Sequence, residues 1–244
     1  MAGEFDFIHW VRAQTPARAS VPIPPGDDLA AVRWDASDLM LIGVDQVLDG
    51  RHFDAAAIFD CPIIGGDTAS WDGPLAITVT IVGRSAGIPP VTRRGAKPSD
   101  GLYVTGPLGG SIAGRHLTFT PRVALARELA SRFRITSMID LSDGLSRDLG
   151  HLCDGSGCGA IVDAAAVPVH EDVGRSAPSG RPPVAQALHD GEDYELLFTS
   201  PDPISPTLAT RVGEMTGDLA VLLTTSGVAS PLIPMGWEHA IPAQ

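Results

Sequence analysis

The sequence predicts a mixed protein of the α+β or the α/β class. Strands are expected where short apolar runs occur, at residues 39–44, 75–82, 102–105, 160–163 and 194–199. Helices are expected where apolar side chains recur at helical spacing, at residues 121–133 and 144–153. Because strands and helices follow one another in irregular order, we expect helical layers to cover a sheet.

Three further segments complete the expected order of elements. Residues 5–11 predict a short amphipathic helix, and the proline-rich residues 16–25 predict a connector. Prolines and arginines cluster at residues 89–100, between two expected strands, and mark the internal boundary. We therefore expect an N-terminal domain of residues 1–92 and a C-terminal domain of residues 93–244.

Acidic side chains dominate the charge of the chain. The 29 Asp and Glu residues outnumber the 17 Lys and Arg residues, so the net charge is -12. Such a surface repels a phosphate backbone, and we expect no nucleic-acid partner. A small polyanion such as ATP can still bind where carboxylates first hold divalent cations. With 44% hydrophobic residues, the chain has enough apolar material for one large globular domain or two smaller ones.

The cysteines and the apolar pattern indicate a cytoplasmic protein. Cys61, Cys153 and Cys158 form no Cys-x-x-Cys pair, and their odd number argues against a disulfide framework. The sequence does not open with a basic stretch followed by an apolar one, and nowhere do about 18 apolar residues run together. We therefore expect neither an export signal nor a membrane span.

Aspartates stand beside glycines at the ends of apolar runs in four places. These places are Gly26-Asp27-Asp28, Val44-Asp45, Gly65-Gly66-Asp67 and Asp140 to Gly144. Glycine permits the close approach of a ligand, and the short side chain of Asp holds a hard cation at a fixed position. Any one of these places, taken alone, is more simply a turn or a helix cap. Four such places together favour metal binding.

The fourth place, Asp140 to Gly144, stands directly before an expected helix. Ser142 or Asp143 can cap this helix, and capping is compatible with metal ligation. Amides at a helix N-terminus also attract phosphate, so this turn can hold a metal on its carboxylates and a phosphate on its amides. Asp148 follows within the helix. We interpret His151, which lacks zinc-site spacing, as a residue that packs or forms hydrogen bonds on that helix.

Other nucleotide-binding and nucleophilic signatures are absent from the sequence. There is no Gly-x-x-x-x-Gly-Lys-Ser/Thr loop, and Lys97 is the single lysine. Residues 105–111 are rich in glycine but do not match Gly-x-Gly-x-x-Gly. No Gly-x-Ser-x-Gly elbow occurs. If the protein handles ATP, metals and arginines must therefore neutralise its phosphates.

Taken in order, these motifs resemble those of the thiamine-monophosphate kinases, which share a superfamily with aminoimidazole ribonucleotide synthetase and selenophosphate synthetase. The most specific stretches are Ile-Asp-Leu-Ser-Asp-Gly-Leu at 139–145 and Gly-Glu-Asp-Tyr-Glu-Leu at 191–196. The other matching stretches, which extend the similarity over nearly the whole chain, are 3–5, 26–28, 50–53, 64–68, 92–98, 103–106 and 236–239.

The resemblance implies an α+β protein with the two-domain aminoimidazole ribonucleotide synthetase-like fold. The N-terminal halves would pair in a homodimer, and ATP would bind between the domains. The implied reaction is the ATP-dependent phosphorylation of thiamine monophosphate to thiamine diphosphate. It would proceed by direct transfer assisted by several Mg2+ ions, without a covalent enzyme intermediate.

The resemblance also assigns roles to individual residues. The implied magnesium ligands are Asp28, Asp45, Asp67, Asp140 and Asp143, with Asp27 adjacent. The implied ATP-binding residues are Gly66, Asp67, Arg93 and Ser142. The implied substrate-binding residues are His52, Glu192 and Trp237, of which Trp237 would offer an aromatic face to a cationic ring.

The sequence departs from the family pattern in its N-terminal half. In the family, the His-Phe stretch is followed by a helix carrying Asn-x-Ser-Asp-x-Ala-Ala-Met, then by a strand and a second helix. Here only residues 54–62 separate Phe53 from Ile63, too few for elements that take about five to twelve residues each. We therefore expect an internally truncated N-terminal domain that lacks one metal-binding Asp.

Gly43 and Val44 also replace the hydroxyl residues that the family has just before the Asp45 position. Fewer oxygen ligands weaken magnesium binding and charge neutralisation. The alternative function is therefore that of a degenerate, non-catalytic homologue, which binds nucleotide or metal or only dimerises.

Overall fold

The computed structural model describes residues 19–23, 30–33, 38–47, 77–85, 87–175 and 180–236. Contacts within the chain separate a compact unit of Val11–Gly87 from the unit that contains Ile88–Gln244. The expected boundary between residues 92 and 93 stays a prediction. The helix expected at residues 5–11 lies outside the described residues.

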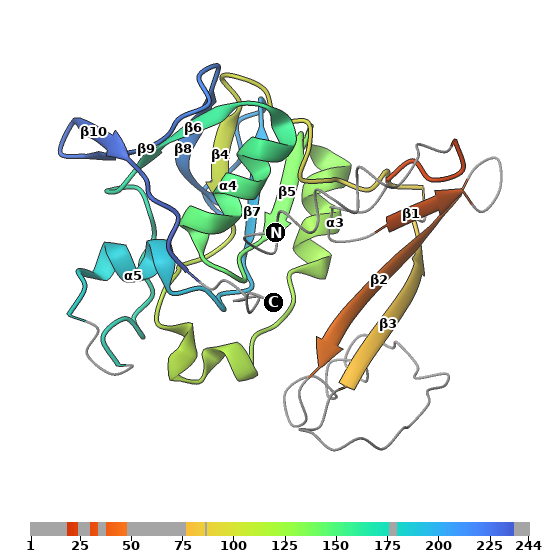
Figure 1. Cartoon of the computed structure of the whole chain (residues 1–244), viewed down its shortest axis with the longest axis horizontal. Helices are drawn as coiled ribbons and strands as arrows, with labels where there is room; N and C mark the ends of the chain where they lie inside the picture. Colours follow the sequence, from red (N-terminus) through yellow and green to blue (C-terminus); the bar gives the residue numbers. More distant parts are fainter. Residues whose placement is uncertain are drawn as a thin grey trace, which may run out of the picture. The chain divides into compact units, whose positions relative to one another are not determined.

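The first unit contains a three-stranded antiparallel sheet in the order β1-β2-β3 (Figure 1). Its strands are β1 (Ala30–Arg33), β2 (Leu39–Val47) and β3 (Ile77–Arg84). The expected strands at 39–44 and 75–82 are confirmed, whereas β1 was not anticipated. At the open end of the sheet, Asp38 Oδ1 accepts a hydrogen bond from Ser85 Oγ at 2.7 Å and Asp38 Oδ2 lies 3.1 Å from Arg84 Nε.

The second unit is built on a seven-stranded sheet in the order β10-β9-β6-β8-β4-β7-β5. All neighbouring strands are antiparallel except the parallel pair β6 and β9. The strands are β4 (Gly101–Val104), β5 (Ser137–Asp140), β6 (Gly159–Asp163), β7 (Leu196–Ser200), β8 (Thr210–Thr216), β9 (Val221–Thr225) and β10 (Val228–Pro231). The strands expected at 102–105, 160–163 and 194–199 are thereby confirmed.

Two apolar clusters cover the two faces of this sheet. Because side chains alternate along a strand, Leu102 and Leu197 face one cluster while Tyr103 and Phe198 face the other. Tyr103 and Phe198 are register partners on neighbouring strands, and their rings stack with centroids 5.4 Å apart. This two-sided burial explains why the central strands read as continuous apolar runs.

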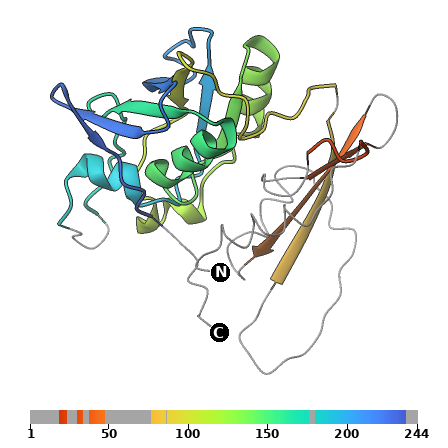
Figure 2. The ribbon, with the colours of Figure 1, turned by 45° about the horizontal axis from the view of Figure 1, so that its top comes forward.

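Helices α4 and α3 cover opposite faces of the sheet (Figures 1 and 2). Helix α4 (Leu145–Ser156) buries Leu145, Leu149 and Leu152 in the larger cluster, while α3 (Val123–Arg132) buries Leu129 in the smaller one. Both helices confirm the expected ones. The remaining helices are α5 (Pro183–His189) and the short 3-10 helices η1 (Ser111–Ala113) and η2 (Arg115–Leu117). Among the described residues, no helix has the length and apolar character needed to cross a membrane.

Candidate functional site

A side chain of α4 stabilises the turn between β5 and α4 by hydrogen bonds to the backbone of the turn. Asp140 ends β5, and the chain turns through Asp143 before α4 begins at Leu145. Asp148, on the first turn of α4, accepts hydrogen bonds at its Oδ2 from the amides of Asp143 (3.1 Å) and Gly144 (3.0 Å). Two of the amides that we expected to be open to phosphate are therefore already used by the protein itself.

Acidic side chains converge at this turn. Ligand atoms of Asp143, Asp148 and His151 all lie within 4.8 Å of one another. Burial, and then the negative charges of Asp143 and Asp140, raise the pKa of Asp148 to about 8, against the two amide hydrogen bonds that lower it. Carboxylate oxygens gathered in this way form a donor set that suits a hard divalent cation.

The turn at residues 191–195 is hydrogen-bonded to the β5–α4 turn. The amide of Glu192 donates to the Ser142 carbonyl at 2.7 Å, and the amides of Asp193 and Tyr194 donate to the Leu141 carbonyl at 3.1 and 2.9 Å. A Cβ on Gly191 would lie only 2.6 Å from the Ser142 carbonyl oxygen, so this close approach requires glycine. The two most specific motifs of the sequence thus form one structural unit.

Backbone strain marks the same turn. Glu192 has φ = 59° and Tyr194 has φ = 52°, a left-handed conformation that side chains other than glycine rarely adopt. Such strain persists where surrounding contacts determine it, as the hydrogen bonds to Ser142 and Leu141 do here.

Two buried carboxylates of this turn bind arginines. Asp193 accepts hydrogen bonds from the Gly109 amide at 2.9 Å and from Arg115 Nη2 at 3.0 Å. Burial raises the pKa of Asp193 to about 6, although the hydrogen bonds from Arg115 and Gly109 oppose this rise. Glu195 accepts hydrogen bonds from Thr105 Oγ1 at 2.6 Å and from both Nε (2.8 Å) and Nη2 of Arg122. This pairing with Glu195 raises the pKa of Arg122.

The C-terminal segment meets the β5–α4 turn as well. Ser146 Oγ donates to the Met235 carbonyl at 2.8 Å and accepts from the Met235 amide at 3.2 Å, so His189 Nδ1, at 2.8 Å, is left as a donor to the same oxygen. A Cβ on Gly236 would lie 2.1 Å from the Asp143 carbonyl oxygen. The residue before Trp237 therefore touches the turn that carries Asp143.

The structure brings several of the expected site residues together and leaves others outside its description. Asp140, Ser142, Asp143 and Glu192 lie in the joined turns. Arg93 lies in the segment beside β5, where the neighbouring Thr92 carbonyl accepts from the Met138 amide and the Arg93 carbonyl accepts from Ser156 Oγ. Asp45 is paired with Val79 in the separate β2–β3 sheet. Outside the described residues lie Asp27, Asp28, His52, Gly66, Asp67 and Trp237.

Sequence reasoning missed the residues that support the site. Arg115 and Arg122 belong to no motif that the sequence displayed, and their partners are 78 and 73 residues away. Ser146 and His189 were also missed, because only the fold places them beside Met235. The alternation of acidic residues at 193 and 195 with a strand following was the one available signal for buried carboxylates.

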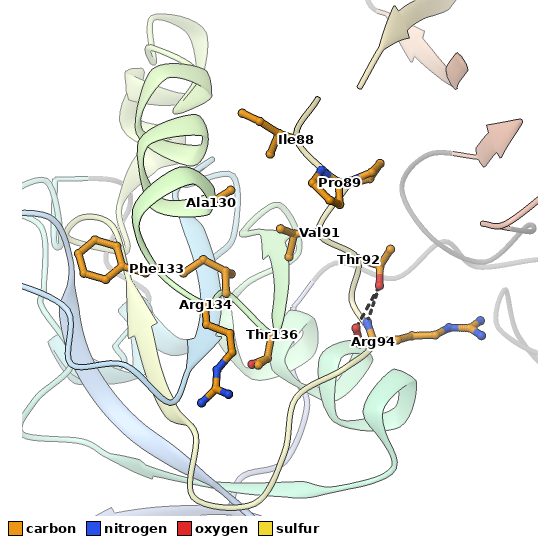
Figure 3. A pocket seen from close by; sticks show the side chains of 11 residues that line it. Ile88, Pro89, Val91, Thr92, Arg94, Ala130, Phe133, Arg134 and Thr136 are labelled. Carbon is orange, nitrogen blue, oxygen red and sulfur yellow. Dashed lines mark hydrogen bonds between the residues drawn. The ribbon is translucent and has the colours of Figure 1, made fainter. Parts of the chain in front are cut away.

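A pocket of about 260 Å³ lies elsewhere in the same unit, between the segment that precedes β4 and the end of α3 (Figure 3). It is lined by Ile88, Pro89, Pro90, Val91, Thr92, Arg94, Ala130, Phe133, Arg134, Ile135 and Thr136. None of the expected site residues that the structure describes lines this pocket. Its Thr92 hydroxyl bonds to the Arg94 backbone, and Thr136 Oγ1 donates to Asp100, so these polar groups already have partners. The joined turns, and not this pocket, therefore carry the described residues for which the sequence predicts a role.

The first comparison with known proteins concerns the fold. The family described as "AIR synthase related protein, C-terminal domain" matches residues 95–222. A solved structure described as "AaThiL complexed with AMPPCP and TMP" superposes with a TM-score of 0.81, at 24% sequence identity, over 98% of this chain and 97% of that chain. The chain therefore has an AIR synthase-like fold, and the expected α+β fold class is confirmed.

The second comparison concerns curated relatives. Thiamine-monophosphate kinase of Rhodopirellula baltica is 43% identical over 146 residues, which cover 59% of this chain and 46% of the relative. The enzyme of the same name from Escherichia coli (strain K12) is 36% identical over 252 aligned positions, which cover 87% of this chain and 76% of the relative. The chain belongs to the thiamine-monophosphate kinase family, although the match spans less than half the length of the Rhodopirellula relative.

Proposed function

We propose that this chain transfers the γ-phosphate of ATP to thiamine monophosphate and so forms thiamine diphosphate. One observation carries the proposal: the Asp143 turn, the Glu192 turn and the segment that leads to Trp237 converge through direct hydrogen bonds and backbone contacts. Residues implied in metal, ATP and substrate binding are thereby gathered around a single turn. Family membership supports the same reaction, because the named relatives are thiamine-monophosphate kinases.

Magnesium fits the donor set of this turn. Asp143, which belongs to the described cluster, would hold Mg2+ just beyond the C-terminal end of β5. The further ligands that the family resemblance implies are Asp28, Asp45, Asp67 and Asp140. When bound, magnesium supplies charge neutralisation for the phosphates, which an acidic protein with a single lysine needs.

The remaining roles fall to groups that bind and orient. Arg93 and Ser142 would contact ATP, as would the backbone around Gly66 and Asp67. On the substrate side, the Glu192 carboxylate would face the cationic thiazolium ring, while His52 and Trp237 would line the rest of the site. No side chain needs to act as a covalent nucleophile, because a phosphate oxygen of thiamine monophosphate attacks the γ-phosphorus of ATP directly. The bond from the γ-phosphorus to the bridging oxygen breaks, and ADP leaves.

The test is a turnover assay on the full chain. The chain is incubated with ATP, magnesium and thiamine monophosphate, and thiamine diphosphate is measured by mass spectrometry. We expect product that requires both magnesium and protein. Product no higher than in a control without protein would refute the kinase. Calorimetric ATP binding in the absence of product would instead support the non-catalytic homologue, which the short connection at residues 54–62 motivates.

A further inference from the structure

We propose that Tyr194 is a positioning residue for substrate recognition, acting through Glu192. This inference rests on the proposed function, in which Glu192 recognises thiamine monophosphate. The Tyr194 hydroxyl donates a hydrogen bond to Glu192 Oε2 at 3.1 Å. Both side chains are partly buried, so the bond forms at the boundary between protein and solvent, where a ligand can reach the carboxylate.

The ring of Tyr194 is itself held in place. It stacks on Phe119, with ring centroids 4.1 Å apart and ring planes inclined by 15°. Phe119 comes from the segment that follows η2 (Arg115–Leu117), far from Tyr194 in sequence. A stacked ring cannot turn away, so its hydroxyl keeps a fixed position for the Glu192 carboxylate.

The backbone on either side reinforces this arrangement. Glu192 and Tyr194 both have left-handed φ values, and between them Asp193 is buried against Arg115. This backbone conformation of the turn places the side chains of Glu192 and Tyr194 close enough for the hydrogen bond. The strain in the turn is therefore coupled to the geometry of the Glu192 carboxylate.

A fixed carboxylate matters because a glutamate side chain has several rotatable bonds. If Glu192 were mobile, binding of the cationic ring would require those bonds to be ordered at that moment, which lowers affinity. Tyr194 orders them beforehand. Loss of the hydroxyl should therefore weaken thiamine monophosphate binding without changing ATP binding or the rate of transfer.

The Tyr194→Phe variant tests this directly, because it removes only the hydroxyl and keeps the stack on Phe119. We expect the KM for thiamine monophosphate to rise about 5- to 20-fold, the loss of one hydrogen bond to a charged group, with kcat and the KM for ATP within about twofold of the parent chain. Tyr103→Phe is the matched control. Tyr103 is the other of the two tyrosines, its ring also stacks on a phenylalanine, and its hydroxyl makes a 3.5 Å contact with the Asp202 carbonyl.

A double-mutant cycle separates positioning from a general structural role. In a Glu192→Gln background, Tyr194→Phe should have little further effect on the KM for thiamine monophosphate, because the group through which it acts is already altered. Phe119→Leu removes the stacked ring and should also raise the KM for thiamine monophosphate. Phe119→Tyr keeps a stacked ring and should leave this KM near the value of the parent chain.

Three results would overturn the assignment: an unchanged KM in Tyr194→Phe, an undiminished Tyr194→Phe effect in the Glu192→Gln background, or an equal rise in the KM for ATP. A parent chain that neither binds nor phosphorylates thiamine monophosphate would refute the proposed function, and this assignment with it. An active parent chain with an unaffected Tyr194→Phe variant would refute the assignment alone.

Discussion

The carboxylates of the candidate site divide into two groups according to their burial. Asp143 stands on the turn itself, partly exposed, while Asp148 is buried beneath it and binds the turn's amides. The turn at residues 191–195 shows the same difference in burial. Glu192 is partly exposed, whereas Asp193 and Glu195 are buried with arginine partners. Exposed carboxylates are available to ligands, whereas buried ones shape the backbone that carries them.

Asp143→Asn should therefore abolish function without unfolding the protein. In the proposed site, this replacement removes one negative charge from the magnesium ligands, and we expect thiamine diphosphate formation to fall about 100- to 1,000-fold. The assay is the mass-spectrometric measurement of product, with thermal unfolding as a check on stability. Asp154→Asn, on the exposed side of α4, is the control and should retain activity. Near-parental activity in Asp143→Asn would contradict the metal role.

Asp148→Asn should change how stability depends on pH. The pKa of Asp148 rises from 3.8 to about 8 on folding, so the folded state keeps a proton that the unfolded state loses. The stability associated with this proton is complete below about pH 4 and is lost progressively as the pH rises to about 8. The amide side chain of the variant does not titrate in this range. The measurement is urea unfolding in the presence of a metal chelator. Between about pH 5 and 8, the free energy of unfolding of the variant should rise relative to that of the parent chain. Parallel pH profiles of the two proteins would contradict the shift in the pKa of Asp148.

At the scale of elements, the site is a junction of turns and not a feature of any one helix or strand. The loop before β7 is fastened to the loop after β5, and the segment after β10 is fastened to the start of α4. Each junction depends on the close approach of two backbones at a glycine, at Gly191 in the first and at Gly236 in the second. A substitution at a junction should therefore lower the free energy of unfolding more when the substituted residue contacts a more deeply buried partner.

Gly191→Ala tests the closest of these approaches. Gly191 has φ = 73°, and an added Cβ would meet the Ser142 carbonyl at 2.6 Å. We expect the free energy of unfolding to fall by about 1 to 3 kcal/mol and thiamine monophosphate binding to weaken. Gly150→Ala is the opposite case, since nothing lies within 4 Å of its added Cβ inside α4, and it should raise stability by up to about 1 kcal/mol. Denaturant titration measures both, and equal effects would contradict the packing argument.

Arg122→Ala tests the tie between α3 and β7. Arg122 is the N-cap residue of α3, and its removal leaves the Glu195 carboxylate, whose side chain is only 5% exposed, without its charged partner. Because Arg122 itself is partly exposed, we expect a loss of about 1 to 3 kcal/mol, less than for a fully buried pair. Arg132→Ala breaks the exposed pair with Glu128 on the same helix and should cost less than about 0.5 kcal/mol. Similar losses in the two variants would show that burial of Glu195 is not the cause.

At the scale of the whole molecule, the two units have different means of burying their sheets. The seven-stranded sheet is covered on both faces by its own clusters. On the three-stranded sheet, Ile81 and Val82 of β3 remain 56% and 61% exposed. These two side chains lie on opposite faces of the sheet, because side chains alternate along a strand, and β3 is an edge strand of its sheet. An edge strand that exposes apolar side chains favours association with another strand.

We therefore propose a homodimer in which the edge strand β3 contacts the second copy of the chain. Light scattering coupled to size-exclusion chromatography should give twice the 25.4 kDa mass of the chain. Val82→Lys should shift the equilibrium towards the monomer, because a charge would be buried at the interface. The exposed residue Leu219, in the other unit, provides Leu219→Lys as a control that should stay dimeric. A monomeric parent chain would contradict the proposal.

The sequence by itself determined the family, the α+β fold class, seven of the elements and the acidic turn at Asp140 to Gly144, because these depend on local pattern and on short motifs. It did not reveal the strand order, the pairing of Arg115 with Asp193, or the pairing of Arg122 with Glu195. Nor did it reveal the hydrogen bonds that join Ser146 to His189 and Met235. Those partners are separated by more than 40 residues, and only the folded sheet brings them within hydrogen-bond distance. A local pattern records which residues are buried, whereas the choice of partner for a buried charge is made by the tertiary structure.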